Sequence, residues 1–300
     1  MDNIIVGLGV QGMKRLCVAG KEVVATIDPV HPKADYRSVM DVPLNNYEAA
    51  LVCTPDDAKI ELLTYLLSNG KHVLVEKPLL TRDNSELIRL QELANSKQVV
   101  CYTAYNHRFE PHFMRMKHLI ESEELGQIYC ARLFYGNGTA RLVRNSSWRD
   151  QGGGVLPDLG SHLLDTALFW FGKPSARFDV YSANRFENRS FDHFSFGSKG
   201  SPLLQFEMTL LSWRNHFYAD VFGEYGSAHI QSLCKWGPSS FIRRFRNLPS
   251  GRPDEESNTL VQPDPTWELE YKHFKELCLN GKSNIKNDIW INTMLKDLMQ

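Results

Sequence analysis

The stretch NIIVGLGVQG, residues 3–12, joins a short apolar segment to a glycine-rich turn. Its first four residues predict a buried strand, and the G-x-G-x-x-G that follows predicts a helix ending near Ala19. Gly7 permits the tight turn, Gly9 lets the backbone approach a pyrophosphate, and Gly12 lets helix and strand pack closely. The dipole and free N–H groups of the first helical turn attract phosphate. The stretch therefore predicts a dinucleotide-binding unit.

A second predicted strand, residues 22–27, ends directly before Asp28. An acidic residue about 20 positions after such a glycine motif accepts a hydrogen bond from the adenosine ribose 2′-hydroxyl. Because a carboxylate repels a 2′-phosphate, Asp28 favours NAD as the cofactor over NADP. The alternative is that Asp28 caps the turn before Pro29.

Strands and helices then alternate. Strands are predicted at residues 49–52, 73–75 and 99–104, and helices at residues 56–69, 81–96 and 112–121. This alternation predicts an α/β domain with a doubly wound parallel sheet, the Rossmann arrangement, at residues 1–118. The Thr54-Pro55 turn follows one of these strands, so it would lie beside the dinucleotide.

A charged pair, Glu76-Lys77, ends the apolar strand at residues 73–75. In an open α/β sheet, ligands bind outside the carboxyl ends of the strands. A lysine at this place can reach a bound substrate, and Pro78 restricts the backbone that aims it. The alternative is a solvated turn that leaves a strand.

The second half of the chain is rich in predicted strands, at residues 128–135, 176–183, 191–197, 203–211, 216–222 and 227–230. Phe206, Met208 and Leu210 alternate with polar residues, which suits an antiparallel sheet with two different faces. Residues 241–258 contain prolines and a glycine and predict a surface loop, and helices are predicted at residues 266–279 and 289–299. We therefore predict a C-terminal α+β domain with an open, mainly antiparallel sheet at residues 119–300.

Three polar residues lie on an otherwise apolar predicted helix, residues 158–171, which follows three glycines. Asp158, His162 and Asp165 are spaced by four and three positions, so they share one face of the helix. They could be a cap with a buried structural pair, or an acid–base pair that faces a nicotinamide, because histidine titrates near neutral pH. No third imidazole or thiolate stands nearby in the sequence, so we predict no metal site.

The composition of the 300 residues is that of an ordinary globular protein, with 42% hydrophobic and 23% charged residues. The formal net charge of −1 argues against nucleic acid and membrane surfaces as partners. The chain starts directly as a strand, and no apolar run approaches the length of a spanning helix. Six scattered cysteines without C-x-x-C spacing indicate a reducing, cytoplasmic location.

Taken in order, the motifs resemble those of the Gfo/Idh/MocA family, named for glucose–fructose oxidoreductase and inositol dehydrogenase. The matching pieces are GLGVQG (7–12), TP (54–55), GKHVLVEKP (70–78), YNHRFEP (105–111), WR (148–149), GGG (152–154) and DLGSHLLD (158–165). The sequence departs from the family at Lys59, where many relatives have histidine, and in a short C-terminus. The resemblance implies a dinucleotide-binding first domain and a second domain that covers the substrate and makes contacts in a homo-oligomer, a dimer or a tetramer.

The resemblance also implies site residues. The catalytic trio would be Lys77, Asp158 and His162. The cofactor-binding residues would be Gly7, Leu8, Gly9, Val10, Gln11, Gly12, Asp28, Thr54, Pro55, Glu76 and Lys77. Candidate substrate ligands are Asn106, His107, Arg108, Trp148, Arg149 and Asp165.

The predicted reaction is an NAD-dependent oxidation of a sugar or polyol hydroxyl. His162 would take the hydroxyl proton, Asp158 would orient it, and Lys77 would hydrogen-bond the reacting oxygen. The alternatives are a sugar-processing enzyme that retains NAD without net redox, and a regulatory protein that binds a dinucleotide. Four arginines could clamp the diphosphate of a nucleotide-linked sugar, unless neighbouring acidic residues balance their charge. They are Arg243, Arg244, Arg246 and Arg252.

Overall fold

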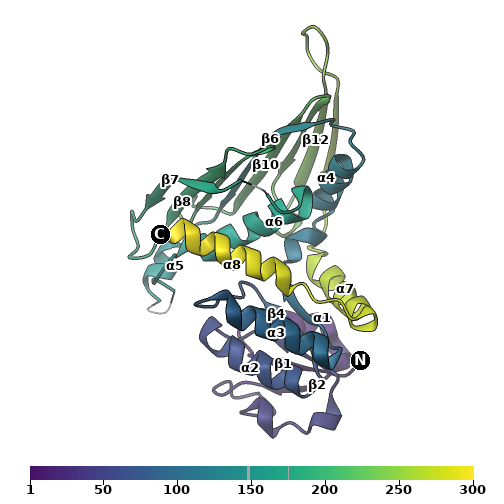
Figure 1. The fold of residues 1–300 in the computed structure, drawn as a ribbon, viewed down its shortest axis with the longest axis vertical. Coiled ribbons are helices and arrows are strands. Elements are labelled where there is room, and N and C mark those ends of the chain that lie inside the picture. Colours follow the sequence, from purple (N-terminus) through teal and green to yellow (C-terminus); the bar gives the residue numbers. More distant parts are fainter. Residues whose placement is uncertain (147–148, 175) are drawn as a thin grey trace. The chain divides into compact units, whose positions relative to one another are not determined.

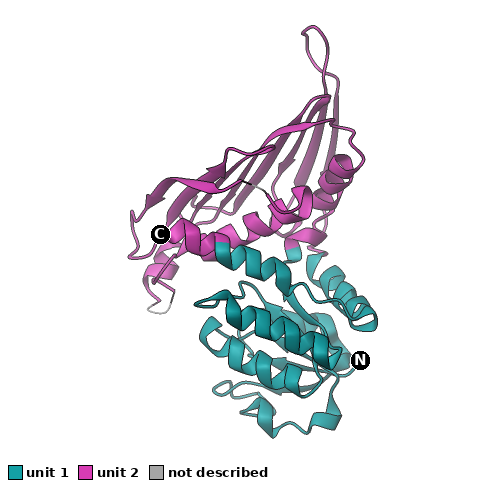
Figure 2. Ribbon diagram, in the orientation of Figure 1, with its two compact units in different colours: residues 1–106, 266–293 teal, residues 107–265, 294–300 magenta. Residues whose placement is uncertain are grey.

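The computed structural model describes residues 1–146, 149–174 and 176–300. By contacts between residues, the chain forms two compact units (Figure 2). Unit 1 consists of Met1–Asn106 and Thr266–Thr293, and unit 2 of His107–Pro265 and Met294–Gln300. The domain ranges 1–118 and 119–300 stay a prediction. The compact units differ from these ranges because unit 1 also contains the segment Thr266–Thr293.

Unit 1 is built on a five-stranded parallel sheet with the order β2-β1-β3-β4-β5. The strands are β1 (Asn3–Val6), β2 (Val23–Ile27), β3 (Ala49–Val52), β4 (His72–Glu76) and β5 (Cys101–Ala104). Every residue of β1, β3 and β5 is buried, as expected for parallel strands covered on both faces. The strand order reverses beside β1, which is where ligands bind in such sheets.

Helices cover both faces of this sheet (Figure 1). They are α1 (Val10–Ala19), α2 (Asp56–Ser68), α3 (Asn84–Lys97), α7 (Thr266–Asn280) and the part of α8 (Ile285–Met299) that ends at Thr293. Leucines of α2 and α3 pack on one face together with Ile285 of α8, and Tyr271 and Phe274 of α7 pack on the other with α1. The α3 helix starts at Asn84, three residues later than predicted, because the Asp83 side chain caps it by accepting a hydrogen bond from the N–H of Ser85.

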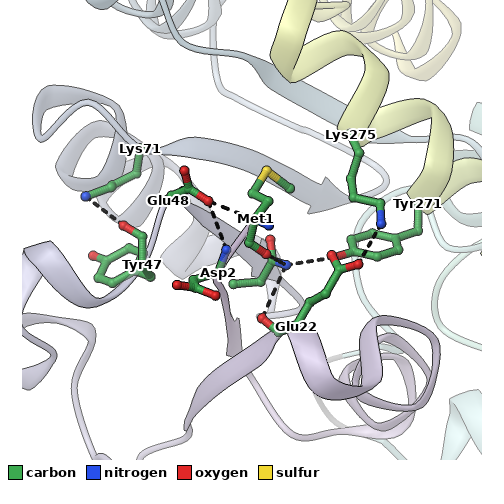
Figure 3. Close-up of polar contacts among 9 residues, drawn as sticks. Met1, Asp2, Glu22, Tyr47, Glu48, Lys71, Tyr271 and Lys275 are labelled. Atoms are coloured by element: carbon green, nitrogen blue, oxygen red, sulfur yellow. Dashed lines mark hydrogen bonds and ion pairs between the residues drawn. The ribbon is translucent and has the colours of Figure 1, made fainter.

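Polar contacts fix α7 against the N-terminal strand (Figure 3). The Tyr271 hydroxyl donates to Glu22 Oε2 at 2.6 Å and accepts from the Asn3 side-chain amide at 2.7 Å. The Lys275 ammonium donates to Glu22 Oε1 at 2.7 Å, and the bonds from Lys275 and Tyr271 lower the pKa of Glu22. A helix near the C-terminus therefore completes the unit that the N-terminus begins.

Unit 2 contains an eight-stranded sheet with the order β13-β12-β11-β10-β6-β9-β8-β7, antiparallel except for the β6–β9 pair. The strands are β6 (Ile128–Gly136), β7 (Phe178–Asn184), β8 (His193–Ser198), β9 (Leu203–Thr209), β10 (His216–Gly223), β11 (Gly226–Gln231), β12 (Ser239–Phe245) and β13 (Glu255–Leu260). The helices are α4 (Pro111–Glu121), α5 (Ala140–Arg144) and α6 (Ser161–Phe171). The predicted fold class, a parallel Rossmann sheet plus a mainly antiparallel open sheet, is confirmed.

The helices α4 and α6 lie on one face of the sheet of unit 2 (Figure 1). Phe113 of α4 packs against Trp170 of α6 and Phe217 of β10, with ring centroids 5.1 Å apart in both pairs. The Trp170 Nε1 group donates to the Phe113 carbonyl at 3.0 Å, so the buried indole keeps a hydrogen-bond partner. The predicted period-two alternation of β9 holds, because Phe206 and Met208 are buried on this face.

The predicted surface loop at residues 241–258 is wrong. Residues 241–245 belong to β12 and residues 255–258 to β13, and the two strands form a hairpin in which Arg244 stands opposite Glu255. Phe241 is fully buried, and the Arg244 guanidinium binds the Glu255 carboxylate at 2.8 Å across the strands. Cross-strand pairs of this kind stabilise sheets, and the prolines and glycine occupy the turn between the strands. No helix within the described residues has the length and apolar character needed to cross a membrane.

Candidate active site

The glycine turn between β1 and α1 has open space beside Gly9, but none for a side chain at Gly7 or Gly12. Gly7 has a φ of 93°, and a Cβ there would lie 2.7 Å from the carbonyl oxygen of Cys53. A Cβ at Gly12 would lie 1.8 Å from the carbonyl oxygen of Gly7. Apart from Gly9 and its two chain neighbours, no atom of the described residues lies within 4 Å of a Cβ built at Gly9. The backbone at Gly9 is therefore open to a ligand, at the start of a ten-residue helix.

Asp28 holds this turn together. One carboxylate oxygen accepts from the N–H of Leu8 at 2.8 Å, and the other accepts from Val30 and His31 at 2.9 and 2.8 Å. Burial raises the pKa of Asp28, but these backbone hydrogen bonds outweigh it and place the pKa below its ordinary value. Asp28 is therefore a carboxylate fixed beside the glycine turn, although it also caps the turn after β2.

The turn after β3 offers a further polar group. Thr54 and Pro55 follow β3 and lead into α2. The Thr54 Oγ1 atom is buried and has no hydrogen-bond partner within the described residues. The exposed Val10 and Gln11 stand at the start of α1, where the backbone N–H groups point out of the helix. Together with Asp28 and the open side of Gly9, these residues fit a dinucleotide: N–H groups for a diphosphate and a carboxylate for a ribose.

Glu76 and Lys77 lie at the end of β4, in unit 1. The Glu76 carboxylate accepts from Arg15 of α1 at 2.8 Å, and Arg15 donates to Glu270 of α7 at 2.6 Å. The Arg15 side chain is 1% exposed, and although burial opposes its charge, the two carboxylates raise its pKa. The end of β4 is therefore tied by a buried ion-pair network to the helix that follows the glycine turn.

The helix predicted to start at Asp158 has a different first turn. Leu156–Gly160 form a π-helical turn, and the α-helix α6 begins at Ser161. Pro157 lies in this turn and has no N–H group to donate, which favours a departure from regular α-helical bonding. The Asp158 side chain is 43% exposed, with a carboxylate oxygen 3.9 Å from Arg149 Nη2.

Asp165 and His162 point into the interior of unit 2. The Asp165 carboxylate accepts two hydrogen bonds from Arg108, at 2.8 and 2.6 Å, in the bidentate geometry that arginine makes with carboxylates. Burial raises the pKa of Asp165, while Arg108 opposes that rise. His162, 7% exposed, stacks on His107, with ring centroids 4.0 Å apart and planes at 16°.

Two residues that sequence reasoning missed complete this cluster. The Lys235 ammonium lies 3.3 Å from His107 Nε2 and 3.2 Å from the Tyr135 hydroxyl. The Tyr135 ring lies 5.9 Å from that of His162. Burial lowers the pKa of Lys235, partly offset by the carboxylates of three acidic residues, Glu110, Asp264 and Asp158. We call His107, Tyr135, His162 and Lys235 the histidine cluster; it gathers four groups that can donate or accept protons.

Glu110 positions the turn that carries Lys235. Its side chain is 1% exposed, and its Oε2 atom accepts from the N–H of Cys234 at 3.1 Å. Burial raises the pKa of Glu110 above its ordinary value. In the sequence, a charged Lys235 stands between the apolar Cys234 and the aromatic Trp236, which is a local signal for a lysine held against apolar neighbours.

The structure distributes the remaining predicted site residues over both units. Asn106 belongs to unit 1, where its amide donates to Thr266 Oγ1 at 2.8 Å. Trp148 lies outside the described residues. Lys77 and the glycine turn belong to unit 1, and Asp158 and His162 belong to unit 2. Across the described ranges, no set of three or more histidine, cysteine, aspartate or glutamate residues is arranged to hold a metal ion.

The arginines considered as a diphosphate clamp are engaged by the protein. Arg243 binds the Glu124 carboxylate at 2.6 Å, and Arg246 donates to the Glu224 carbonyl at 3.0 Å. With Arg244 on Glu255, three of the four guanidinium groups have acceptors within unit 2. These contacts favour the alternative that the charge of the arginines is balanced within the protein, over a clamp for a diphosphate.

Comparisons with known proteins agree with this architecture. Residues 17–105 match a model of an oxidoreductase family with an NAD-binding Rossmann fold, and residues 113–229 match the GFO/IDH/MocA C-terminal domain. An uncharacterized oxidoreductase of Schizosaccharomyces pombe is 35% identical over 43% of this chain and 35% of its own length. The scyllo-inositol 2-dehydrogenase (NADP(+)) of Bacillus subtilis is 31% identical over 49% of this chain and 41% of its own length.

The matches thus span less than half the length of these two relatives. Among solved structures, a levoglucosan dehydrogenase in complex with NADH superposes with a TM-score of 0.84 at 18% identity, covering 99% of this chain and 95% of the other. That likeness shows the fold. One family model matches within each unit, and the chain belongs to the Gfo/Idh/MocA family of oxidoreductases.

Proposed function

We propose that this protein is an NAD-dependent dehydrogenase that transfers a hydride between a sugar or polyol hydroxyl and the nicotinamide. The observation that carries the proposal is the histidine cluster, a buried group of proton-active side chains, in a chain whose other unit fits a dinucleotide. The names of relatives, an inositol dehydrogenase and a levoglucosan dehydrogenase, support a hydroxylated substrate.

Oxidation of an alcohol requires a base for the hydroxyl proton and a partner for the developing negative charge on oxygen. We assign the base to His162, oriented by Asp158 at the preceding π-helical turn. We assign to Lys77 the hydrogen bond to the reacting oxygen, because a lysine at the end of β4 stands where substrates bind in such sheets. A bound nicotinamide would supply the hydride acceptor.

The substrate class is tested by a screen of free sugars, polyols and nucleotide-linked sugars for NADH formation. Steady accumulation of NADH with a free sugar or polyol is the expected result, since three clamp arginines already bind protein groups. Turnover of substrate without net NADH would contradict a dehydrogenase. An absence of turnover across all substrates, with NAD bound, would point to a regulatory protein.

NAD is the proposed cofactor because the Asp28 carboxylate is held beside the glycine turn. We expect Asp28→Asn to lower the ratio of kcat/KM for NAD to that for NADP by about tenfold, the effect of roughly 1.4 kcal/mol. Asparagine keeps one side-chain oxygen, which can accept either from the N–H of Leu8 or from those of Val30 and His31, so we expect the variant to fold. Asp28→Ala should shift the ratio similarly but lower the Tm further, since it loses three backbone bonds. A wild type with the higher kcat/KM for NADP would contradict the assignment.

We also propose a homo-oligomer, a dimer or a tetramer, formed through the sheet of unit 2. Its face opposite to α4 and α6 carries aromatic side chains, including Phe134 and Tyr218, which stack with centroids 5.2 Å apart. A monomer mass by light scattering at all concentrations would exclude this.

The six cysteines, all free thiols, are the basis for placing the protein in a reducing cytoplasm.

A further inference from the structure

Lys59, on α2, is a buried lysine whose hydrogen bonds surround Lys77. Its side chain is 2% exposed. Its Nζ atom donates to the carbonyl oxygen of Glu76 at 2.7 Å, to that of Pro78 at 2.8 Å, and to Asp56 Oδ1 at 2.6 Å. Two of its three acceptors are therefore the carbonyl groups of the residues directly before and directly after Lys77.

An ammonium group has three N–H donors and no acceptor, so these three contacts use its full capacity. A buried charge that lacks partners is costly, and the Asp56 carboxylate balances this one. The arrangement binds the Glu76–Lys77 peptide group and the Pro78–Leu79 peptide group, on either side of the Lys77–Pro78 bond, to a single charged atom. Because a side chain leaves the backbone along the Cα–Cβ bond, holding the backbone directly before Lys77 and directly after Pro78 restricts the direction in which the Lys77 side chain starts.

We propose that Lys59 is a positioning residue, which holds the backbone at Lys77 so that the Lys77 ammonium meets the reacting hydroxyl oxygen. The proposal rests on the proposed function, in which Lys77 contacts that oxygen. Catalytic groups must be held within a fraction of an ångström, and a displacement of about 1 Å can cost a hundredfold in rate. β4 ends at Glu76, which pairs with Ala104 of β5, and the bonds from Lys59 add a second support for the backbone at this strand end.

The alternative is that Lys59 only stabilises the fold, and Lys71 provides a matched control. Lys71 stands at the other end of β4, directly before its first residue. Its Nζ atom also donates to two carbonyl oxygens, that of Leu44 at 2.6 Å and that of Tyr47 at 2.8 Å. Figure 3 shows the contact with Tyr47. Both lysines thus bind two backbone carbonyls, but only those held by Lys59 flank Lys77.

The test is a double-mutant cycle measured on the full chain with NAD and a substrate from the screen. Lys59→Met and Lys71→Met are made in the wild type and in Lys77→Met, and kcat, KM for NAD and Tm are measured. We expect both replacements to lower the Tm, and only Lys59→Met to lower kcat, by about ten- to a hundredfold. The KM for NAD should change less than twofold. In Lys77→Met, the further replacement of Lys59 should leave kcat unchanged, because the group that it positions is gone.

The outcomes of the cycle test the role of Lys59 separately from the role of Lys77. An equal loss of kcat from Lys59→Met with and without Lys77 would overturn the positioning role, as would a similar loss from Lys71→Met. Near-normal turnover by Lys77→Met alone would refute the proposed role of Lys77, which is a separate failure. If Lys59→Met does not fold, Lys59→Gln enters the same cycle, because its amide still has two N–H donors. We expect Lys59→Gln to lower kcat less than Lys59→Met does, and to be non-additive with Lys77→Met in the same way. If Lys59→Gln shows no such non-additivity, the result counts against the proposal.

Discussion

Replacing His162 with glutamine is expected to lower kcat for alcohol oxidation by about 10²–10⁴-fold, the range for a general base. Glutamine is close to histidine in size and can hydrogen-bond, but it cannot take up a proton. In the wild type, oxidation requires the unprotonated base, so kcat should fall as the pH falls through the pKa of that group. This acidic limb should disappear in His162→Gln. The measurement is kcat against pH at saturating NAD and substrate.

His107 supplies the control, because its ring stacks on that of His162 and both are nearly buried. His107→Gln alters the packing of the histidine cluster and its contact with Lys235, but it leaves the imidazole of His162 in place. We expect a smaller loss of kcat and a retained acidic limb. If His107→Gln removes the acidic limb and His162→Gln does not, the base is His107 and the assignment is wrong.

The local parts of this architecture could be predicted from the sequence. The glycine turn, the start of α3 at Asp83 and the Lys77 strand end depend on residues within a few positions of one another. Each has a signal of its own: a required backbone conformation, a capping side chain, or an apolar run that stops at a charge.

The parts that could not be predicted depend on long-range contacts. Lys235 is 128 positions from His107 and 100 from Tyr135, and only the pairing of β6, β10 and β11 brings them together. The hairpin of β12 and β13 was missed because prolines and a glycine in its turn outweighed the alternation of its strands. The prediction that Asp158 and His162 share one face assumed a regular α-helix. In the structure, Asp158 lies in a π-helical turn that precedes α6.

The contact between Arg108 and Asp165 should have the largest effect on stability of the pairs in unit 2. We expect Arg108→Met to lower the free energy of unfolding near neutral pH by about 3 kcal/mol, because it leaves a buried carboxylate without its cation. Arg108 is 23% exposed and Asp165 only 2%, so the cost arises chiefly from Asp165. Urea denaturation at a series of pH values measures it.

The pH dependence of this loss has a definite sign. Burial already raises the pKa of Asp165 in the folded protein, so the folded state holds the proton more tightly than the unfolded state does. Such a group lowers stability as the pH rises from its ordinary pKa through the folded value. Without Arg108 the folded pKa rises further, and the deficit of Arg108→Met should therefore shrink as the pH falls. A deficit that is equal at every pH would contradict this account.

Arg108→Lys is the matched variant, since it keeps the charge but loses the bidentate geometry. A smaller loss of stability with a weaker pH dependence is expected.

The contact between Arg108 and Asp165 also has a consequence for the histidine cluster. Arg108 directly follows His107, and Asp165 lies one helical turn after His162, so their contact fixes the two stacked rings relative to each other. Arg108→Met should for this reason lower kcat as well as stability, and Arg108→Lys should restore part of both.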